Sequence, residues 1–210
     1  HCFKVRQEDE QKLQKIPHWE YHKHNTVTVP APTATQILHA AGIAFACKLR
    51  KAPIVTIAYC SDDTTAEADF LEGIHFAAQH QLPVIFICEQ DCSPNDTHPP
   101  HIQGIELPAG LTHQRVDGCD IVTVYTAMQH AMQHARSGQG PILLEMSVTR
   151  LDPPSQVQQD DEASNDPLTR CQHYLLTHDL WDETWAQELH TLFSMEVERA
   201  MQDALRDGLI

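Results

Sequence analysis

Two apolar runs separated by an amphipathic stretch dominate the pattern of hydrophobic and polar positions along this chain. Residues 54–59 (IVTIAY) and 84–88 (VIFIC) are apolar at nearly every position, and residues 64–79 carry apolar side chains at helical spacing. Short apolar runs without alternation are typical of strands buried on both faces of a parallel sheet. The pattern therefore predicts a strand–helix–strand unit over residues 54–91.

Polar and acidic side chains follow each of the two predicted strands. They are Ser61, Asp62 and Asp63 after the first strand, and Glu89, Gln90 and Asp91 after the second. In open parallel sheets, ligands bind outside the carboxyl ends of the strands. We therefore expect a functional site of this chain to lie at these two strand ends.

Helices and strands continue to alternate over the following residues, and the chain ends in helices alone. The further predicted elements are a helix from Thr33 to about Lys51, a strand or lead-in at 119–124, a helix at 125–137, a strand at 141–148, and helices at 168–178 and 183–205. Alternation of this kind is typical of a parallel sheet with crossover helices. The predicted fold class is α/β, a mostly parallel sheet with helices on both faces, plus a C-terminal helical appendage.

Proline-rich and acidic residues separate the two parts of this prediction. We expect an α/β domain over residues 1–150, an acidic loop over 151–167 and C-terminal helices over 168–210. The chain starts at His1 rather than Met, so we expect its natural N-terminal part to be missing.

Charge and cysteine content narrow the possible partners and the compartment. The 210 residues include 14 Lys plus Arg against 29 Asp plus Glu, a formal net charge of −15, which argues against nucleic acid and anionic membrane surfaces. No apolar run approaches the length of a membrane span, and no signal-peptide pattern is present. Seven cysteines, several inside apolar segments, indicate reduced thiols in the cytoplasm, or in the mitochondrial matrix of a eukaryote.

Four segments then carry a resemblance to a known family. They are PAPTATQILHAAGIAFACKLRK, AEADFLEGIHFAAQHQLPVIFICEQD, the stretch from RVDGCD to GPILLEMSVTR, and LTRCQHYLLTHDLWDETWAQEL. In these segments the chain resembles the alpha subunit of the thiamine-diphosphate-dependent 2-oxoacid dehydrogenases, of the branched-chain type. The combination of Val116–Asp120 (VDGCD) with Ser137–Glu145 (SGQGPILLE) is the most specific part of the resemblance.

The resemblance implies a thiamine diphosphate and Mg²⁺ site at the two strand ends. The implied cofactor-binding positions are Thr33, through its carbonyl, and Ser61, Asp62, Asp63 and Thr64. The implied Mg²⁺ ligands are Asp62, Asp91 and the carbonyl of Ser93, since Mg²⁺ takes oxygen ligands. Pro32, Thr35 and Gln36 match a segment that binds potassium in the branched-chain type. The implied partners are a beta subunit, in an alpha2-beta2 assembly, and a lipoyl acyltransferase core.

Several positions depart from the family pattern where the chemistry occurs. Ser61 and Asp63 replace the two glycines that let the backbone approach the diphosphate, and Glu89 stands where the branched-chain type has an arginine. Pro153 and Pro154 replace a pair of histidines, and proline cannot transfer protons. No residue of this chain is therefore assigned a catalytic role.

Three hypotheses follow for the function. The first is a working alpha subunit that catalyses oxidative decarboxylation of a 2-oxoacid and transfers the acyl group to a lipoyl carrier. The second is a catalytically degenerate relative that acts as a structural or regulatory subunit. The third is an acidic module in which Asp62, Asp63, Glu89 and Asp91 bind a divalent cation without the cofactor.

Overall fold

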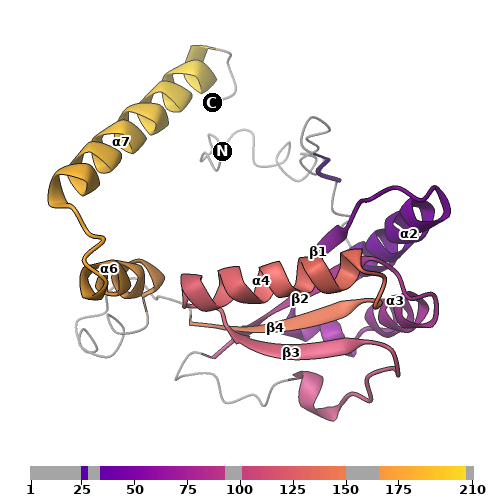
Figure 1. Ribbon diagram of the computed structural model, residues 1–210. Coiled ribbons are helices and arrows are strands. Elements are labelled where there is room, and N and C mark those ends of the chain that lie inside the picture. Colours follow the sequence, from indigo (N-terminus) through magenta and orange to yellow (C-terminus); the bar gives the residue numbers. More distant parts are fainter. Residues whose placement is uncertain (1–24, 28–33, 93–100, 150–165, 207–210) are drawn as a thin grey trace. The chain divides into compact units, whose positions relative to one another are not determined.

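The structure is a computed structural model that describes residues 25–27, 34–92, 101–149 and 166–206 (Figure 1). Of the predicted site residues, Pro32, Thr33 and Ser93 lie outside these ranges, as do Pro153 and Pro154. The chain divides into two compact units, one formed by residues 30–173 and the other by residues 1–29 and 174–210. The boundaries expected from the sequence stay a prediction.

A sheet of four parallel strands forms the centre of the unit that spans residues 30–173. The strands are β1 (Thr56–Ser61), β2 (Val84–Asp91), β3 (Thr112–Asp117) and β4 (Ile142–Val148), in the spatial order β1-β2-β4-β3 (Figure 1). Every neighbouring pair is parallel. Their carboxyl ends therefore lie along the same edge of the sheet, and the α/β prediction is confirmed.

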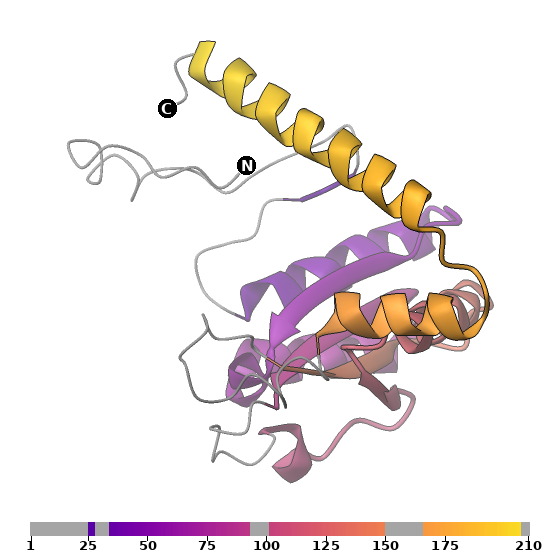
Figure 2. The ribbon, with the colours of Figure 1, turned by 90° about the vertical axis from the view of Figure 1, so that its left-hand side faces the viewer.

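Helices cover both faces of this sheet, as the sequence predicts. α2 (Thr35–Leu49) and α3 (Ala68–Gln79) pack with Ala58, Phe86 and Leu143 in one buried cluster. α4 (Ile121–Arg136) packs its alanines against Ile85, Ile142 and Leu144 in the other (Figures 1 and 2). α2 and α3 approach each other closely at Gly73, where an added Cβ would come within 2.7 Å of Ile37 Cγ2.

Burial of the first strand differs from the prediction. β1 is buried on the α2 side, but Ile57 and Tyr59 on its other side are 41% and 59% exposed. α4 packs against β2, β4 and β3, and β1 is at the edge of the described sheet. An apolar run therefore did not suffice to predict burial on both faces, because burial depends on which strand the helix covers.

The third strand was predicted at the wrong position. β3 spans Thr112–Asp117, whereas residues 121–124 of the predicted strand form the first turn of α4. Asp120 is the N-cap of α4, and its carboxylate accepts hydrogen bonds from the backbone N–H groups of Val122 (2.9 Å) and Thr123 (3.2 Å). In the run CDIVTV, Asp120 stands directly before apolar positions, and a capping residue in that place is typical of the start of a helix.

Two helices follow the acidic segment, as predicted. They are α6 (Pro167–Thr177) and α7 (Glu183–Arg206). Arg170 in the first turn of α6 donates to the carboxylate of Asp117 at 2.8 Å and to that of Asp120 at 3.5 Å. None of the helices in the described ranges has the length and apolarity needed to cross a bilayer.

Candidate functional site

The carboxyl ends of β1 and β2 bring the predicted acidic residues together. Ser61 and Glu89 are direct neighbours in the parallel register, and the 3-10 helix η3 (Asp62–Ala66) begins immediately after β1. Asp91 ends β2 at the same edge. The structure therefore places Asp62, Asp63, Glu89 and Asp91 around one edge of the sheet, as the hypothesis of a strand-end site requires.

Side-chain hydroxyl groups in the turn after β1 form hydrogen bonds within the turn. Thr64 Oγ1 donates to the carbonyl of Ser61 and Thr65 Oγ1 to the carbonyl of Asp62, both at 2.6 Å, and both threonines are buried. Ser61 Oγ donates to the carboxylate of Asp63. These bonds hold a tight turn whose side chains bond to the turn itself. The sequence predicted Thr64 as a cofactor-binding residue, and in the structure its hydroxyl holds the turn.

Three carboxylates at this edge, those of Asp62, Asp63 and Glu89, have no neighbouring cation in the described ranges. No ion pair joins Asp62, Asp63 or Glu89 to Lys, Arg or His there. Asp63 and Glu89 are exposed, Asp62 is half-buried, and Gln90 is buried beside them. The arrangement offers carboxylate oxygens to a hard cation and repels a phosphate group.

Two predicted potassium ligands join α2 to its surroundings. Thr35 Oγ1 donates to the carboxylate of Asp69 at 2.9 Å, and Gln36 Nε2 donates to the carbonyl of Tyr59 at 3.4 Å. Gln36 Oε1 is buried and has no hydrogen-bond partner within the described residues. The hydroxyl of Thr35 thus has a structural contact, while the amide oxygen of Gln36 is left as a free acceptor.

A buried carboxylate in β4 lies among polar residues that the sequence prediction missed. Glu145 is only 1% exposed, and its Oε2 lies 2.8 Å from His113 Nε2 and 3.0 Å from Arg115 Nε. Its Oε1 has no hydrogen-bond partner in the parts of the chain that the structure describes. Glutamate inside the otherwise apolar segment PILLEMSV was the available signal, since buried acids are rare without partners.

Two cysteines form a second feature that the prediction missed. Cys60 in β1 and Cys88 in β2 are direct neighbours in the register and lie in the same buried cluster. The proximity of the two thiols is the main reason why the pKa of Cys60 is lowered and the pKa of Cys88 is raised, while burial acts to raise both. In the sequence, each cysteine immediately precedes the polar residues at the end of its strand, Ser61 in one case and Glu89 in the other. Only the strand register shows that the two cysteines are neighbours.

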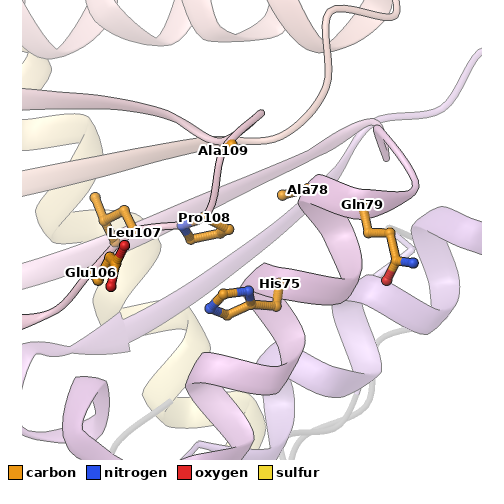
Figure 3. A pocket seen from close by; sticks show the side chains of 7 residues that line it. All are labelled: His75, Ala78, Gln79, Glu106, Leu107, Pro108 and Ala109. Atoms are coloured by element: carbon orange, nitrogen blue, oxygen red, sulfur yellow. The ribbon is translucent and has the colours of Figure 1, made fainter.

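An open hollow of about 570 Å³ lies away from these groups, at the end of α3 (Figure 3). It contains none of the predicted site residues, and its lining is His75, Ala78, Gln79, Glu106, Leu107, Pro108 and Ala109. Across the described ranges, no group of three or more His, Cys, Asp or Glu side chains has the geometry of a metal site. The hypothesis that Asp62, Asp63, Glu89 and Asp91 together bind a cation is therefore not supported by the described residues. The strand ends of β1 and β2 remain the candidate site only for the cofactor and metal positions that the family resemblance implies.

Comparisons with known proteins point to one family. The family model described as "Dehydrogenase E1 component" matches residues 3–209. The 2-oxoisovalerate dehydrogenase subunit alpha of Bacillus subtilis is 32% identical, with 87% of this chain and 62% of that protein covered. The mitochondrial 2-oxoisovalerate dehydrogenase subunit alpha 1 of Arabidopsis thaliana is 29% identical, with 97% of this chain and 47% of that protein covered.

The match extends to relatives named for a different substrate. The pyruvate dehydrogenase E1 component subunit alpha of Staphylococcus aureus is 31% identical, with 80% of this chain and 50% of that protein covered. The chain thus spans between 47% and 62% of the length of these three relatives. Because the family model matches nearly every residue, the chain belongs to the dehydrogenase E1 component family.

Proposed function

We propose that this chain functions within the alpha subunit of a branched-chain-type 2-oxoacid dehydrogenase, the component that decarboxylates a 2-oxoacid. Support comes from the family match over residues 3–209 and from relatives named as 2-oxoisovalerate dehydrogenase alpha subunits. The parallel sheet with acids at its carboxyl edge is compatible with this assignment. The reaction would be oxidative decarboxylation that depends on thiamine diphosphate, followed by acyl transfer to a lipoyl carrier.

The implied Mg²⁺ has suitable oxygen donors at the strand ends. Asp62 begins η3 and Asp91 ends the neighbouring strand β2, so two carboxylates come from adjacent strand ends. Hard divalent cations prefer such oxygen ligands. We propose Asp62 and Asp91 as Mg²⁺ ligands, with the carbonyl of Ser93 as a third.

The implied diphosphate does not fit the residues at the same edge. The family glycines are replaced by Ser61 and Asp63, whose side chains bond to each other across the turn. The hydroxyls of Thr64 and Thr65 donate to carbonyls of the turn and do not point to a ligand. Asp63 and Glu89 add negative charge, which opposes phosphate binding. For these reasons we derive no step of the reaction through the cofactor.

This mismatch favours a second candidate function, a catalytically degenerate subunit with a structural or regulatory role. The observation behind it is the closed, acidic turn after β1, in contrast to the well-packed apolar core around it. Such a subunit would keep the fold and the contact with a beta subunit in an alpha2-beta2 assembly. A lipoyl acyltransferase core would be the further partner.

Potassium and the compartment are finer parts of the proposal. Gln36 Oε1, which is buried and has no hydrogen-bond partner among the described residues, supports a monovalent cation near the start of α2, together with Thr35 and Pro32. The cysteines at 47, 60, 88, 92, 119 and 171 are free thiols, which supports a reducing compartment such as the cytoplasm or the mitochondrial matrix.

Calorimetry with thiamine diphosphate and Mg²⁺ separates the two functions. The chain is titrated alone and with a co-expressed beta subunit, and decarboxylation of 2-oxoisovalerate is measured in parallel. Micromolar binding together with decarboxylation would exclude the degenerate subunit. Absence of binding in both forms would exclude the working subunit.

A triple substitution tests whether the strand-end chemistry is the cause. Ser61→Gly, Asp63→Gly and Glu89→Arg together restore the family pattern, and we expect cofactor binding to appear or to strengthen at least tenfold. The matched control is Glu188→Arg, which makes the same charge change as Glu89→Arg at an exposed position of α7. Equal binding by the triple variant and the control would contradict this account of the site.

A further inference from the structure

The open hollow at the end of α3 lies at the edge of the sheet opposite to the candidate site. α3 follows the turn at the carboxyl end of β1 and ends at Gln79, shortly before the first residue of β2. The other wall of the hollow is formed by residues 106–109, which precede the start of β3 at Thr112. Because the strands are parallel, both walls lie at the amino ends of the strands. The hollow is therefore separate from the strand ends that carry Asp62 and Asp91.

Backbone contacts hold the two walls of the hollow against each other. The backbone N–H of Leu111 donates to the carbonyl of Pro108 at 3.2 Å, and Gly110 between them has a φ of +91°, so these residues form a tight turn that favours glycine. An added Cβ on Gly110 would lie 3.5 Å from the carbonyl oxygen of Ala78 in the last turn of α3. Leu107 and Leu111 also pack on the buried cluster to which α3 contributes. The hollow is thus formed by the fold before any ligand binds.

The lining of the hollow combines an apolar surface with two polar side chains that have no partner. Leu107 and Pro108 are half-buried and Ala78 is buried, while His75 and Glu106 are exposed. Figure 3 shows the imidazole ring of His75 directed toward the loop that carries Glu106 and Pro108. Among the residues that the structure describes, neither His75 nor Glu106 forms a side-chain hydrogen bond or an ion pair. Both side chains are therefore available to a ligand.

The charge around the hollow favours a cation. Glu106 supplies a carboxylate, and α3 ends here without a basic residue in its last turn, where the carbonyl groups carry partial negative charge. This helix end already attracts one cation, because Lys48 Nζ donates to the carbonyls of His80 (2.7 Å) and Gln81 (3.0 Å). A metal ion does not fit, since nowhere in the described ranges do three His, Cys, Asp or Glu side chains converge. The cation that fits is an organic one with an apolar body.

We propose that this hollow binds a small aromatic ammonium ion, in which a short alkyl chain joins the ammonium group to the ring. The ammonium group lies against the Glu106 carboxylate, and the ring packs between the imidazole of His75 and Pro108, with Leu107 as further apolar surface. The volume of about 570 Å³ falls within the range of about 300–1,000 Å³ found for small-molecule pockets. The site depends on neither of the two functions proposed above. Because the hollow is open to solvent, we expect a dissociation constant on the order of 1 mM.

An amide NMR titration of the full, isotope-labelled chain tests the proposal. The probes are phenethylammonium, phenethyl alcohol and phenylacetate, which carry the same ring with a positive, no and a negative charge. Ionic strength is held constant, since salt screens exposed charges. We expect chemical-shift changes confined to amides at 75–79 and 106–109, and binding about threefold tighter for the ammonium ion than for the alcohol. Phenylacetate should bind most weakly.

Three variants assign the contacts of the ligand. Glu106→Gln keeps the shape of the side chain and should make the ammonium ion and the alcohol bind equally. Glu72→Gln, at an exposed position of α3 outside the hollow, is the matched control and should keep the preference for the ammonium ion. His75→Ala should weaken all three probes by a similar factor, because it removes the flat surface against which the ring packs.

Four results would overturn the proposal. The wild-type chain could show no chemical-shift changes at the hollow, or changes mainly at other residues. It could bind the ammonium ion and the alcohol equally. Lastly, Glu72→Gln could weaken binding of the ammonium ion as much as Glu106→Gln does, which would show a general effect of negative charge and no site at Glu106.

Discussion

Two glycines in neighbouring helices offer a test of how α2 packs on α3. Gly42 in α2 is exposed, and an added Cβ there meets nothing within 4 Å. Gly73 in α3 is buried, and its added Cβ would lie 2.7 Å from Ile37 Cγ2 and 3.3 Å from the Ile37 backbone carbon. The same substitution to alanine therefore has opposite consequences at these two positions.

The magnitudes follow from helix propensity and overpacking. Alanine replaces glycine in a helix interior with a gain of about 0.5–1 kcal/mol, so Gly42→Ala should raise the free energy of unfolding by that amount. Gly73→Ala has the same gain, but overpacking against the fully buried Ile37 costs about 1–3 kcal/mol. The propensity terms cancel in a comparison, so Gly73→Ala should be less stable than Gly42→Ala by about 1–3 kcal/mol.

Urea unfolding, followed by far-UV circular dichroism, measures this difference. A double variant sharpens the test: Ile37→Leu removes the Cγ2 methyl group, so Gly73→Ala should cost less in that background than in the wild-type chain. If Gly73→Ala stabilises the chain as much as Gly42→Ala does, α2 and α3 are not in the close contact described here.

Three further predictions concern single contacts around the sheet. Asp120→Ala removes the N-cap of α4 and should lower the free energy of unfolding by about 1 kcal/mol in urea titrations, whereas Asp120→Asn retains the acceptor and should cost less. The hydrogen bond from Arg170 lowers the pKa of Asp117, so the ion pair stabilises the folded chain fully above the unfolded-state pKa of Asp117 and loses this effect as the pH falls through the lower folded-state pKa. Arg170→Gln should therefore reduce the loss of stability on acidification, measured as the free energy of unfolding against pH. An unchanged acid side of that curve would show that this ion pair does not contribute to it. Thr35→Val removes the hydrogen bond to Asp69 and should destabilise by about 1 kcal/mol, measured by thermal unfolding, with Thr35→Ser as the variant that keeps the hydroxyl.

Local sequence patterns predicted the elements in which apolar residues dominate. Residues 84–88 and 141–148 are apolar runs, and they contain most of β2 and all of β4. β3 was misplaced because its sequence, THQRVD, is mostly polar and pairs with β4 alone among the described strands. The hydrogen bonds that define such a strand come from its neighbour, so its own residues carry little signal.

In the candidate site, too, the sequence predicted some features and the folded structure decided others. Sequence and family resemblance together located Asp62 and Asp91 at the ends of two neighbouring strands, and the structure places both there. The hydrogen bonds that turn Ser61, Thr64 and Thr65 inward were not predicted, since a hydroxyl can serve a ligand or its own backbone equally well. Only the folded turn decides between these uses.

The sequence by itself determined the fold class and the strand ends that carry the acids, because periodicity and residue identity are properties of the chain alone. The tertiary structure decided which side chains meet. Strand order and register place Cys60 against Cys88 and Glu145 beside Arg115, and the position of α4 leaves one side of β1 exposed. These pairings join residues far apart in the chain, and their energies depend on neighbours that local patterns do not specify.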